Sequence, residues 1–327
     1  MSAPLLEVDD LSVAFGAPGG DLFAVEGVSF AVEPGEIVAL VGESGSGKSA
    51  TSMALARLNE GPGAAIGGSI RLNGEDVLAM DAARLRQLRG KGIAMVFQDA
   101  MTALNPCETI GDQIAESLVV HGTANWRAAR ARAVALLDEV GMPEPQRRAG
   151  LYPHEVSGGQ RQRAMIALAL ACDPHLLIAD EPTTALDVTI QAQILALLSH
   201  MVRRRGMAMI LITHDLGVVA GVADRVMVIY AGRIVEMATV EALFAAPRHP
   251  YTRDLIKAAG MERDAGGHLA AIAGAPPRID RKGDGCAYAP RCANAIEKCH
   301  ARRPELASVG RSLAACWHPV PDSDGAP

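Results

Sequence analysis

Short apolar runs alternate with segments of helical character along most of the chain. The runs rich in Val, Ile and Leu predict buried strands, and they cover residues 37–41, 93–97, 175–179, 208–213 and 225–230. The intervening segments that favour helices cover 82–89, 110–120, 126–140 and 188–205. Strands that alternate with helices in this way predict an α/β fold with a mostly parallel sheet covered on both faces.

Three regions depart from this alternation. Residues 5–13 and 24–32 read as strands joined by a glycine-rich loop, which predicts an antiparallel sheet at the N-terminal edge. Residues of about 100–160 lack strand signals, so we expect a helical insertion there. The chain becomes rich in Gly, Pro and Cys after about Gly260, which predicts one main domain over 1–260 and a small Cys-rich extension over 261–327.

Residues 42–49 fit the phosphate-binding pattern G-x-x-x-x-G-K-S/T. A predicted strand precedes them and a predicted helix over 50–58 follows, which is the context that this P-loop requires. Glycines let the backbone fold around an anion, and the helix N-terminus adds a positive dipole end. Lys48 would then reach the β- and γ-phosphates, and the Ser49 hydroxyl would bind Mg²⁺. The remaining loop residues of this nucleotide site are Gly42, Ser44, Gly45, Ser46 and Gly47.

Polar side chains also follow several predicted strands. Asp180 and Glu181 stand at the carboxyl end of an apolar strand, where parallel sheets bind their ligands. Asp180 fits a Mg²⁺ ligand opposite Ser49, and Glu181 can orient or deprotonate a water in line with the γ-phosphate. Gln98 and His214 also end strands; the first can reach Mg²⁺ or the attacking water, and the second can donate to the γ-phosphate. Taken singly, each could instead be a solvated strand end.

Composition and charge narrow the class of partner. The net charge is −6 and aromatic residues make up 3% of the chain, so nucleic acid is not expected as a main partner. No apolar run approaches the ~18 residues of a membrane span, and no signal peptide is evident. Because a P-loop needs ATP or GTP, we expect a cytosolic protein with reduced cysteines. The mean hydropathy of +0.16 suggests apolar surface docked on a partner.

The order and spacing of these residues resemble those of the motifs of an ABC ATPase, and the resemblance covers about residues 5 to 250. Gln98, Asp180 with Glu181, and His214 look like its Q-loop, Walker B motif and H-switch. Its signature and D-loop are matched by Ser157, Gly158, Gly159, Gln160 and by Ala185, Leu186, Asp187. The signature departs in one place, since Val156 stands where Leu is commonest.

The resemblance also assigns an adenine-stacking aromatic. Phe15 looks like the A-loop residue that stacks on the base, with Phe23 as its rival and a core aromatic as the other alternative. In such a family two ATPase subunits form a head-to-tail dimer. ATP on Lys48 and Ser49 of one subunit is closed over by Ser157 and Gly159 of the other.

A narrower resemblance concerns residues 99–106, residues 248–252 and the Cys-rich tail. They are similar to the ATPase subunits of oligopeptide and dipeptide importers, a group that includes nickel importers. The resemblance implies a second ATPase subunit (commonly a different chain), two transmembrane permeases and an extracytoplasmic substrate-binding protein. It places the chain on the cytoplasmic face of the membrane, with short peptides as the expected cargo and nickel or another small solute as the alternative. Residues 101–106 and the helices after them would hold the docking groove for a permease helix.

Two other functions remain as rivals. A soluble ABC ATPase that acts on ribosomes or DNA usually carries two cassettes or long coiled-coil insertions, and the sequence has neither. A small-molecule kinase would use the P-loop but gives no role to Ser157–Gln160 or His214.

Four of the six cysteines are concentrated in the tail. Cys286, Cys292, Cys299 and Cys316 have the spacing C-x₅-C-x₆-C-x₁₆-C. Zinc sites usually contain closely spaced cysteine pairs, and the ferredoxin run is tighter, so neither pattern matches. A 4Fe-4S cluster fits the wider loops and is what similar family tails imply, while Zn²⁺ and free thiols stay open.

The remaining candidate ligands have simpler interpretations. His318 could substitute as a cluster ligand or be a surface histidine. Cys107 and Cys172 lie in the ATPase part of the chain and are expected to be buried apolar fillers.

Overall fold

The computed structural model describes residues 3–17, 20–61, 63–184, 186–260, 271–279 and 283–321. The described residues form two compact units. Unit 1 draws on residues 1–5, 32–36 and 75–211, and unit 2 on residues 6–31, 37–74 and 212–327. Two predictions fall partly outside the described residues, namely Ala185 of the D-loop and the start of the extension at 261–270.

Unit 2 contains the predicted N-terminal antiparallel sheet. Its strands are β1 (Leu6–Ala17), β2 (Gly20–Val32) and β4 (Ala64–Leu72), in the order β2-β1-β4. Strand β1 runs antiparallel to β4, with Leu6 opposite Leu72 and Phe15 opposite Ala64. Apolar residues alternate along β1 and face the core, which is the pattern of a sheet with one buried face.

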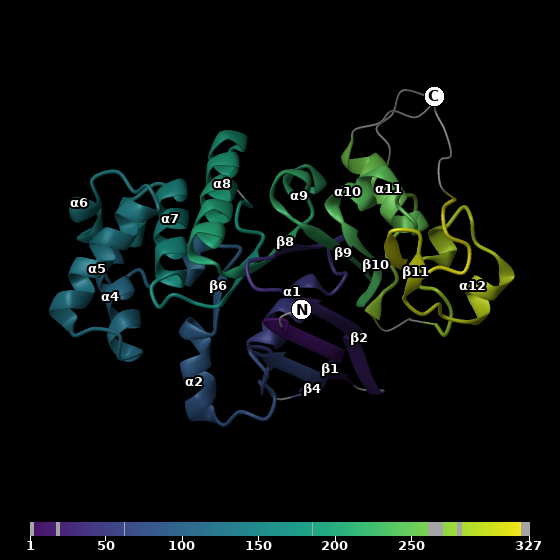
Figure 1. The fold of residues 1–327 in the computed structure, drawn as a ribbon, viewed down its shortest axis with the longest axis horizontal. Coiled ribbons are helices and arrows are strands. Elements are labelled where there is room, and N and C mark those ends of the chain that lie inside the picture. The colour runs from purple at the N-terminus through teal and green to yellow at the C-terminus, as the bar shows by residue number, and fades with distance from the viewer. Residues whose placement is uncertain are drawn as a thin grey trace. The chain divides into compact units, whose positions relative to one another are not determined.

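A second sheet in unit 2 carries the strand that leads into the P-loop. Strand β3 (Ile37–Val41) is entirely buried and pairs in parallel with β9 (Arg225–Tyr230). Strand β10 (Arg233–Thr239) returns antiparallel to β9. The C-terminal extension adds β12 (Ser312–Ala314) to the edge of β10, followed by β11 (Ala307–Val309) (Figure 1). The extension is therefore joined to the sheet of β3, β9 and β10 by backbone pairing.

Helices and a tyrosine cluster complete unit 2. The helices are α1 (Lys48–Leu55), α9 (Leu216–Val222), α10 (Val240–Ala245), α11 (Pro250–Ala259), the short η3 (Ala289–Arg291) and α12 (Glu297–Ala301). Tyr230, Tyr251 and Tyr288 meet in the core, with ring centroids 4.6 to 5.3 Å apart. Such close ring pairs add stabilisation beyond the area that they bury. A chain poor in aromatics thus places three of its four tyrosines at one point, against the extension.

Unit 1 combines parallel strands with a large group of helices. Strand β6 (Ile93–Val96) lies parallel to β7 (Leu176–Asp180), and β8 (Ala208–Thr213) follows on the other side of β7. The remaining elements are β5 (Glu75–Asp76), α2 (Ala82–Lys91), α3 (Ala100–Ala103), α4 (Ile110–Val120), α5 (Trp126–Glu139), α6 (Pro145–Ala149), η1 (Pro153–Glu155), α7 (Gly158–Ala169) and α8 (Val188–Arg205).

The fold class inferred from the sequence is confirmed. Between residues 100 and 160 the chain forms only helices and turns, which we call the helical block (Figure 1). Of the helices in the described part of the chain, none combines the length and apolar character that a bilayer crossing requires.

Candidate nucleotide site

The P-loop of unit 2 depends on glycine at three positions. Gly45 and Gly47 have φ of 75° and 104°, in the left-handed region that side chains with a Cβ rarely adopt. A Cβ on Gly42 would lie 2.3 Å from the carbonyl oxygen of Ile229, so the loop and β9 could not approach as they do. Helix α1 then begins at Lys48 with Gly47 as its N-cap. The sequence therefore shapes a loop whose backbone N–H groups can surround an anion.

Two buried side chains of the loop, Lys48 and Ser46, carry hydrogen-bond donors that suit an anion. The buried Lys48 ammonium donates to the carbonyl oxygens of Gly42 and Glu43 at 2.8 and 3.0 Å. The Ser46 hydroxyl is buried and has no hydrogen-bond partner among the described residues. Buried polar atoms are normally paired, so a hydroxyl without a partner is unusual at this position. Ser44 and Ser49 remain exposed.

Two residues far along the chain hold the P-loop through Glu43. The Tyr251 hydroxyl accepts a hydrogen bond from the Glu43 backbone N–H at 2.9 Å. Arg291 donates to both carboxylate oxygens of Glu43, at 2.7 and 3.0 Å, and to the Tyr230 hydroxyl at 3.1 Å. Its hydrogen bond to Glu43 raises the pKa of the Arg291 guanidinium, while burial raises the pKa of Tyr251. Sequence reasoning missed this role of Arg291, because nothing local to it points to the loop.

The two predicted acidic residues stand in unit 1, at the end of β7. Asp180 is buried, and Glu181 adopts φ of 45°, an uncommon conformation for a residue other than Gly or Asn. Such strained positions cluster at functional sites. Gln98 donates to the Glu181 carboxylate at 3.2 Å, and Thr184 donates to the same oxygen at 3.0 Å. The structure thus brings together Gln98 and Glu181, each of which the sequence predicted at the end of a strand.

The signature motif forms the N-terminus of α7 in unit 1. Ser157 and Gln160 make a capping box, in which each side chain accepts the other's backbone N–H at 3.4 and 3.2 Å. A Cβ on Gly159 would lie 3.1 Å from Ile190 of α8, so glycine permits the close approach of the two helices. Val156 is buried and supplies an apolar side chain where Leu is commonest.

The other predicted residues occupy varied positions. His214 directly follows β8 and is exposed, in unit 2. The Asp187 carboxylate caps α8 by accepting from the Ile190 N–H at 3.0 Å. Phe15 and Phe23 are equally exposed, at 39%, so neither is a buried core aromatic and exposure does not separate the two candidates.

Comparison with known proteins decides the family. Residues 25–184 match the ABC transporter family, and residues 235–299 match the oligopeptide/dipeptide transporter C-terminal region. A Brucella melitensis protein named as a peptide import ATP-binding protein is 52% identical over 320 residues, covering 94% of this chain and 95% of its own. The chain belongs to the ABC transporter family.

Further relatives agree with this ABC transporter assignment. A Brucella abortus protein, also named as a peptide import ATP-binding protein, is 48% identical over 99% of this chain and 97% of its own. Among solved structures, the ATP-binding cassette MJ0796, in a dimeric post-hydrolysis state with ADP and Pi, superposes with a TM-score of 0.65 at 26% identity, covering 72% of this chain and 98% of that chain. The cassette cbiO1 of Clostridium perfringens gives 0.64 at 26% identity, over 75% and 92% of the two chains. This ABC transporter chain is an ATPase.

The four tail cysteines of this ABC ATPase surround one small cavity. Cys286, Cys292, Cys299 and Cys316 line it together with His318. The Cys286 N–H donates to the Cys299 carbonyl at 2.7 Å. Burial raises the pKa of Cys316 to about 11 and also raises those of Cys286 and Cys292. Within the described residues, no group of three or more His, Cys, Asp or Glu is arranged to hold a metal ion, so the metal stays a prediction.

The other two cysteines differ from each other. Cys172 is buried beside Ser117, which confirms its prediction as an apolar filler. The prediction for Cys107 was wrong, because this residue is exposed. Its N–H donates to the Asn105 side chain at 3.0 Å, so the segment is a surface turn built on Asn105 rather than part of the core.

Proposed function

We propose that this ATPase powers the import of di- and oligopeptides through partner permeases. One observation carries the proposal: the segment that matches the oligopeptide/dipeptide transporter C-terminal region contains Arg291, which holds the P-loop at Glu43. Relatives that share about half of their residues with nearly the whole chain are named for peptide import. Nickel or another small solute is the rival cargo.

The binding of ATP is assigned to the P-loop. Lys48 would reach the β- and γ-phosphates, the Ser46 hydroxyl and backbone N–H groups would donate to them, and Phe15 would stack on adenine. The hard oxygen ligands of Ser49, Asp180 and Gln98 suit Mg²⁺. When bound, this ion neutralises charge on the β- and γ-phosphates.

Hydrolysis is assigned to residues that would face the γ-phosphate of bound ATP. Glu181, fixed by Gln98 and Thr184, would orient or deprotonate the attacking water. His214 would donate to the γ-phosphate, and its exposed position leaves it accessible for this purpose. A hydrogen bond from Gln98 to the base supports a role in placing both the base and the water.

A second ATPase subunit, commonly a paralogous chain, would complete each site. Ser157 and Gly158 are exposed at the start of α7. This helix N-terminus presents a positive dipole end, which suits the γ-phosphate held by the other subunit. Gly159, Gln160 and Asp187 would join that contact. Closure of the dimer on ATP would then drive the permeases, and hydrolysis would reset it.

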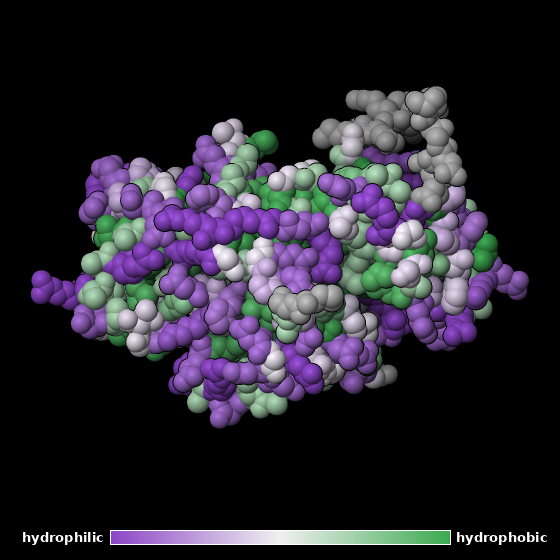
Figure 2. All heavy atoms as spheres, in the orientation of Figure 1, coloured by the Kyte–Doolittle hydropathy of each residue, from purple (hydrophilic) through white to green (hydrophobic). Residues whose placement is uncertain are grey.

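The helical block is proposed to contact the two permeases, because it exposes apolar side chains. Met101, Val120 and Trp126 are 56%, 62% and 47% exposed, which is high for apolar side chains. Apolar residues break the hydrophilic surface over this block in Figure 2. Exposed apolar patches often mark interaction sites. The proposed location is therefore peripheral, at the cytoplasmic face of the membrane, with an extracytoplasmic binding protein delivering the cargo.

The extension over 261–327 is proposed as a metal-stapled addition to the ATPase domain over 1–260. Four cysteines around one cavity are a suitable donor set for a 4Fe-4S cluster, whose four irons spread the ligand sulfurs further apart than a single ion does. The cluster would cross-link a segment with few large apolar residues. Zn²⁺ is the alternative occupant.

Reconstitution tests the cargo. The chain, its partner ATPase and the permeases encoded beside it are placed in proteoliposomes with ATP inside and the binding protein outside. We expect uptake of a labelled tripeptide that requires ATP and is lost with Lys48→Ala. Uptake of nickel without uptake of any di- or tripeptide would overturn the peptide assignment.

A further inference from the structure

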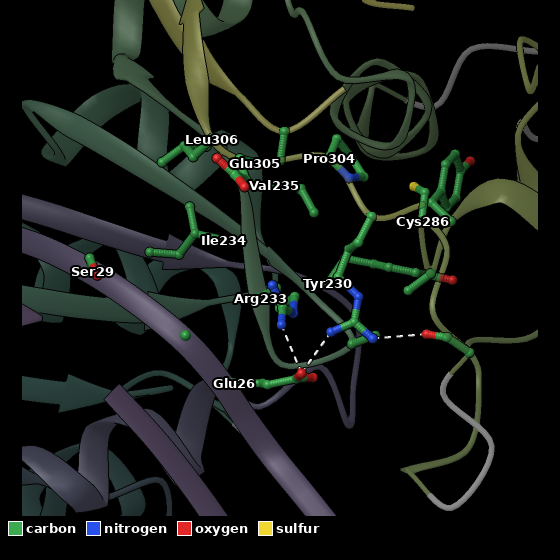
Figure 3. A pocket seen from close by; sticks show the side chains of 17 residues that line it. Glu26, Ser29, Tyr230, Arg233, Ile234, Val235, Cys286, Pro304, Glu305 and Leu306 are labelled. Atoms are coloured by element: carbon green, nitrogen blue, oxygen red, sulfur yellow. Dashed lines mark hydrogen bonds and ion pairs between the residues drawn. The ribbon is translucent and has the colours of Figure 1, made fainter. Parts of the chain in front are cut away.

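We propose that a cavity in unit 2, separate from the P-loop, binds a small zwitterion with an apolar side chain, such as an amino acid of leucine size or a dipeptide. The cavity has a volume of about 220 Å³ and lies between β2, the β9–β10 turn and the C-terminal extension (Figure 3). It is smaller than the ~300–1,000 Å³ typical of drug-sized ligands, which limits the occupant to a few heavy atoms beyond an amino acid.

One end of the cavity is suited to a carboxylate. Glu26 accepts from Arg233 at 2.7 Å and from Arg303 at 2.6 Å, through the same oxygen Oε1 (Figure 3). Two guanidinium groups therefore share one carboxylate, which leaves one positive charge. A ligand carboxylate placed in the cavity against the two guanidinium groups would balance this positive charge.

The middle of the cavity is apolar. Its walls come from the aliphatic residues of β10 and from the extension, namely Ile234, Val235, Ala287, Pro304 and Leu306, with Tyr230 beside them. Removing an aliphatic side chain from water against such walls is favourable in proportion to the area buried. An inorganic anion has no apolar part to pack against these walls, so it fits the cavity less well.

The other end carries negative charge. Glu305 is an exposed residue of the lining, and Figure 3 shows it beside Val235, on the side of the cavity away from Glu26. An ammonium group placed there would meet a carboxylate while its charge stays partly in water. In an extended dipeptide such as Ala-Leu the carboxylate and the ammonium group stand at opposite ends, which matches the order of cationic, apolar and anionic lining. Leucine carries both charged groups on Cα and would use only the cationic end and the apolar middle.

Binding to the purified full chain tests the proposal by isothermal titration calorimetry. The probes are L-leucine and the dipeptide Ala-Leu, compared with leucinamide, which lacks the carboxylate, and 4-methylpentanoate, which lacks the ammonium group. We expect one site that binds leucine or Ala-Leu, with leucinamide at least about tenfold weaker because it cannot pair with Arg233 and Arg303. Permeases are absent, so the result is independent of the transported cargo.

Variants locate the site. Leu306→Trp should fill the cavity and abolish binding while leaving both arginines in place. Arg233→Ala should weaken binding about tenfold, and Arg311→Ala, an exposed arginine outside the lining, should not change it. The proposal is overturned if neither probe binds at millimolar concentration, if leucinamide binds as well as leucine, or if Leu306→Trp retains full affinity.

Discussion

Arg291 donates hydrogen bonds to both carboxylate oxygens of Glu43, although 248 positions separate the two residues in the chain. The Arg291 side chain is only 5% exposed, and it also donates to the Tyr230 hydroxyl. Glu43 stands inside the phosphate-binding loop. The C-terminal extension thus holds the P-loop at Glu43, and Arg291 is a positioning residue for that loop.

Replacing Arg291 should weaken nucleotide binding. Arg291→Ala removes a bidentate pair from a largely buried position and leaves Glu43 without its cation, which costs roughly 1–3 kcal/mol. We expect the Kd for ATP to rise about tenfold, measured with a fluorescent nucleotide. Arg291→Lys should recover only part of the affinity, because an ammonium cannot make the paired hydrogen bonds.

A merely structural role for Arg291 gives a different result. In that case the melting temperature would fall while the Kd for ATP stayed at the wild-type value. The double variant Glu43→Gln/Arg291→Ala measures the coupling directly, and it should cost less than the sum of the two single changes. Arg311→Ala is the matched control for loss of one positive charge.

Glu181 should be required for hydrolysis and not for binding. Glu181→Gln keeps the side-chain shape and can still accept the hydrogen bonds from Gln98 and Thr184, but it cannot take a proton from water. We expect ATPase activity to fall at least about a hundredfold, with ATP affinity retained and a closed dimer trapped on size-exclusion chromatography. Lys48→Ala should instead lose ATP binding. A near wild-type turnover of Glu181→Gln would remove this residue from the catalytic role.

The tail cysteines should carry iron. Protein purified without oxygen should be brown and contain about four irons, the content of one 4Fe-4S cluster. Cys292→Ser should lose the metal and lower the melting temperature, because the extension loses its cross-link. Cys107→Ser is the matched control, since Cys107 is an exposed thiol remote in sequence from the tail. Stoichiometric zinc without iron, or no metal at all, would refute the cluster.

Mild acid should destabilise the protein through His249. Burial lowers the pKa of this histidine to about 4. Its Nδ1 accepts the Tyr251 N–H at 3.1 Å, so the ring must stay neutral at that nitrogen. The unfolded chain, with an ordinary pKa of about 6.5, binds more protons below that pH. Stability contributed by neutral His249 is therefore present above pH ~6.5 and is lost as the pH falls toward ~4.

The size of this effect can be measured by urea unfolding. We expect His249 to account for a loss of about 2 kcal/mol between pH 7 and pH 5. His249→Asn retains a side-chain acceptor at the N-cap of α11 and does not titrate, so its stability should vary less over this range. Equal pH dependence of the two proteins would show that His249 does not govern the acid response.

Local sequence accounts for much of the nucleotide site. The P-loop, the strand before it and the helix after it are fixed by residues next to one another, because glycine conformations and strand periodicity act over a few residues. The strand ends at Gln98 and Asp180 could be placed for the same reason. The rule that parallel sheets bind their ligands at the carboxyl ends of the strands gave these residues candidate roles, whereas the hydrogen bond between Gln98 and Glu181 came only from the structure.

Contacts between distant segments could not be predicted in this way. Tyrosines occur in cores, turns and surfaces alike. The residues next to Tyr230, Tyr251 and Tyr288 therefore gave no indication that the three rings pack together. The prediction for Cys107 failed because burial was inferred from its place within the ATPase part of the chain, whereas the turn at Asn105 exposes it.

The sequence by itself determined the family and the ATPase activity, and it predicted which residues would surround the phosphates, because each of these inferences rests on spacing within short motifs. Only the tertiary structure decided that Arg291 holds Glu43, that four tail cysteines line one cavity, and that Arg233 and Arg303 share Glu26 beside an apolar pocket. Each of these depends on the extension folding back onto the β9–β10 strands. The positions of such long-range contacts are set by the packing of the whole unit, which no short stretch of sequence encodes.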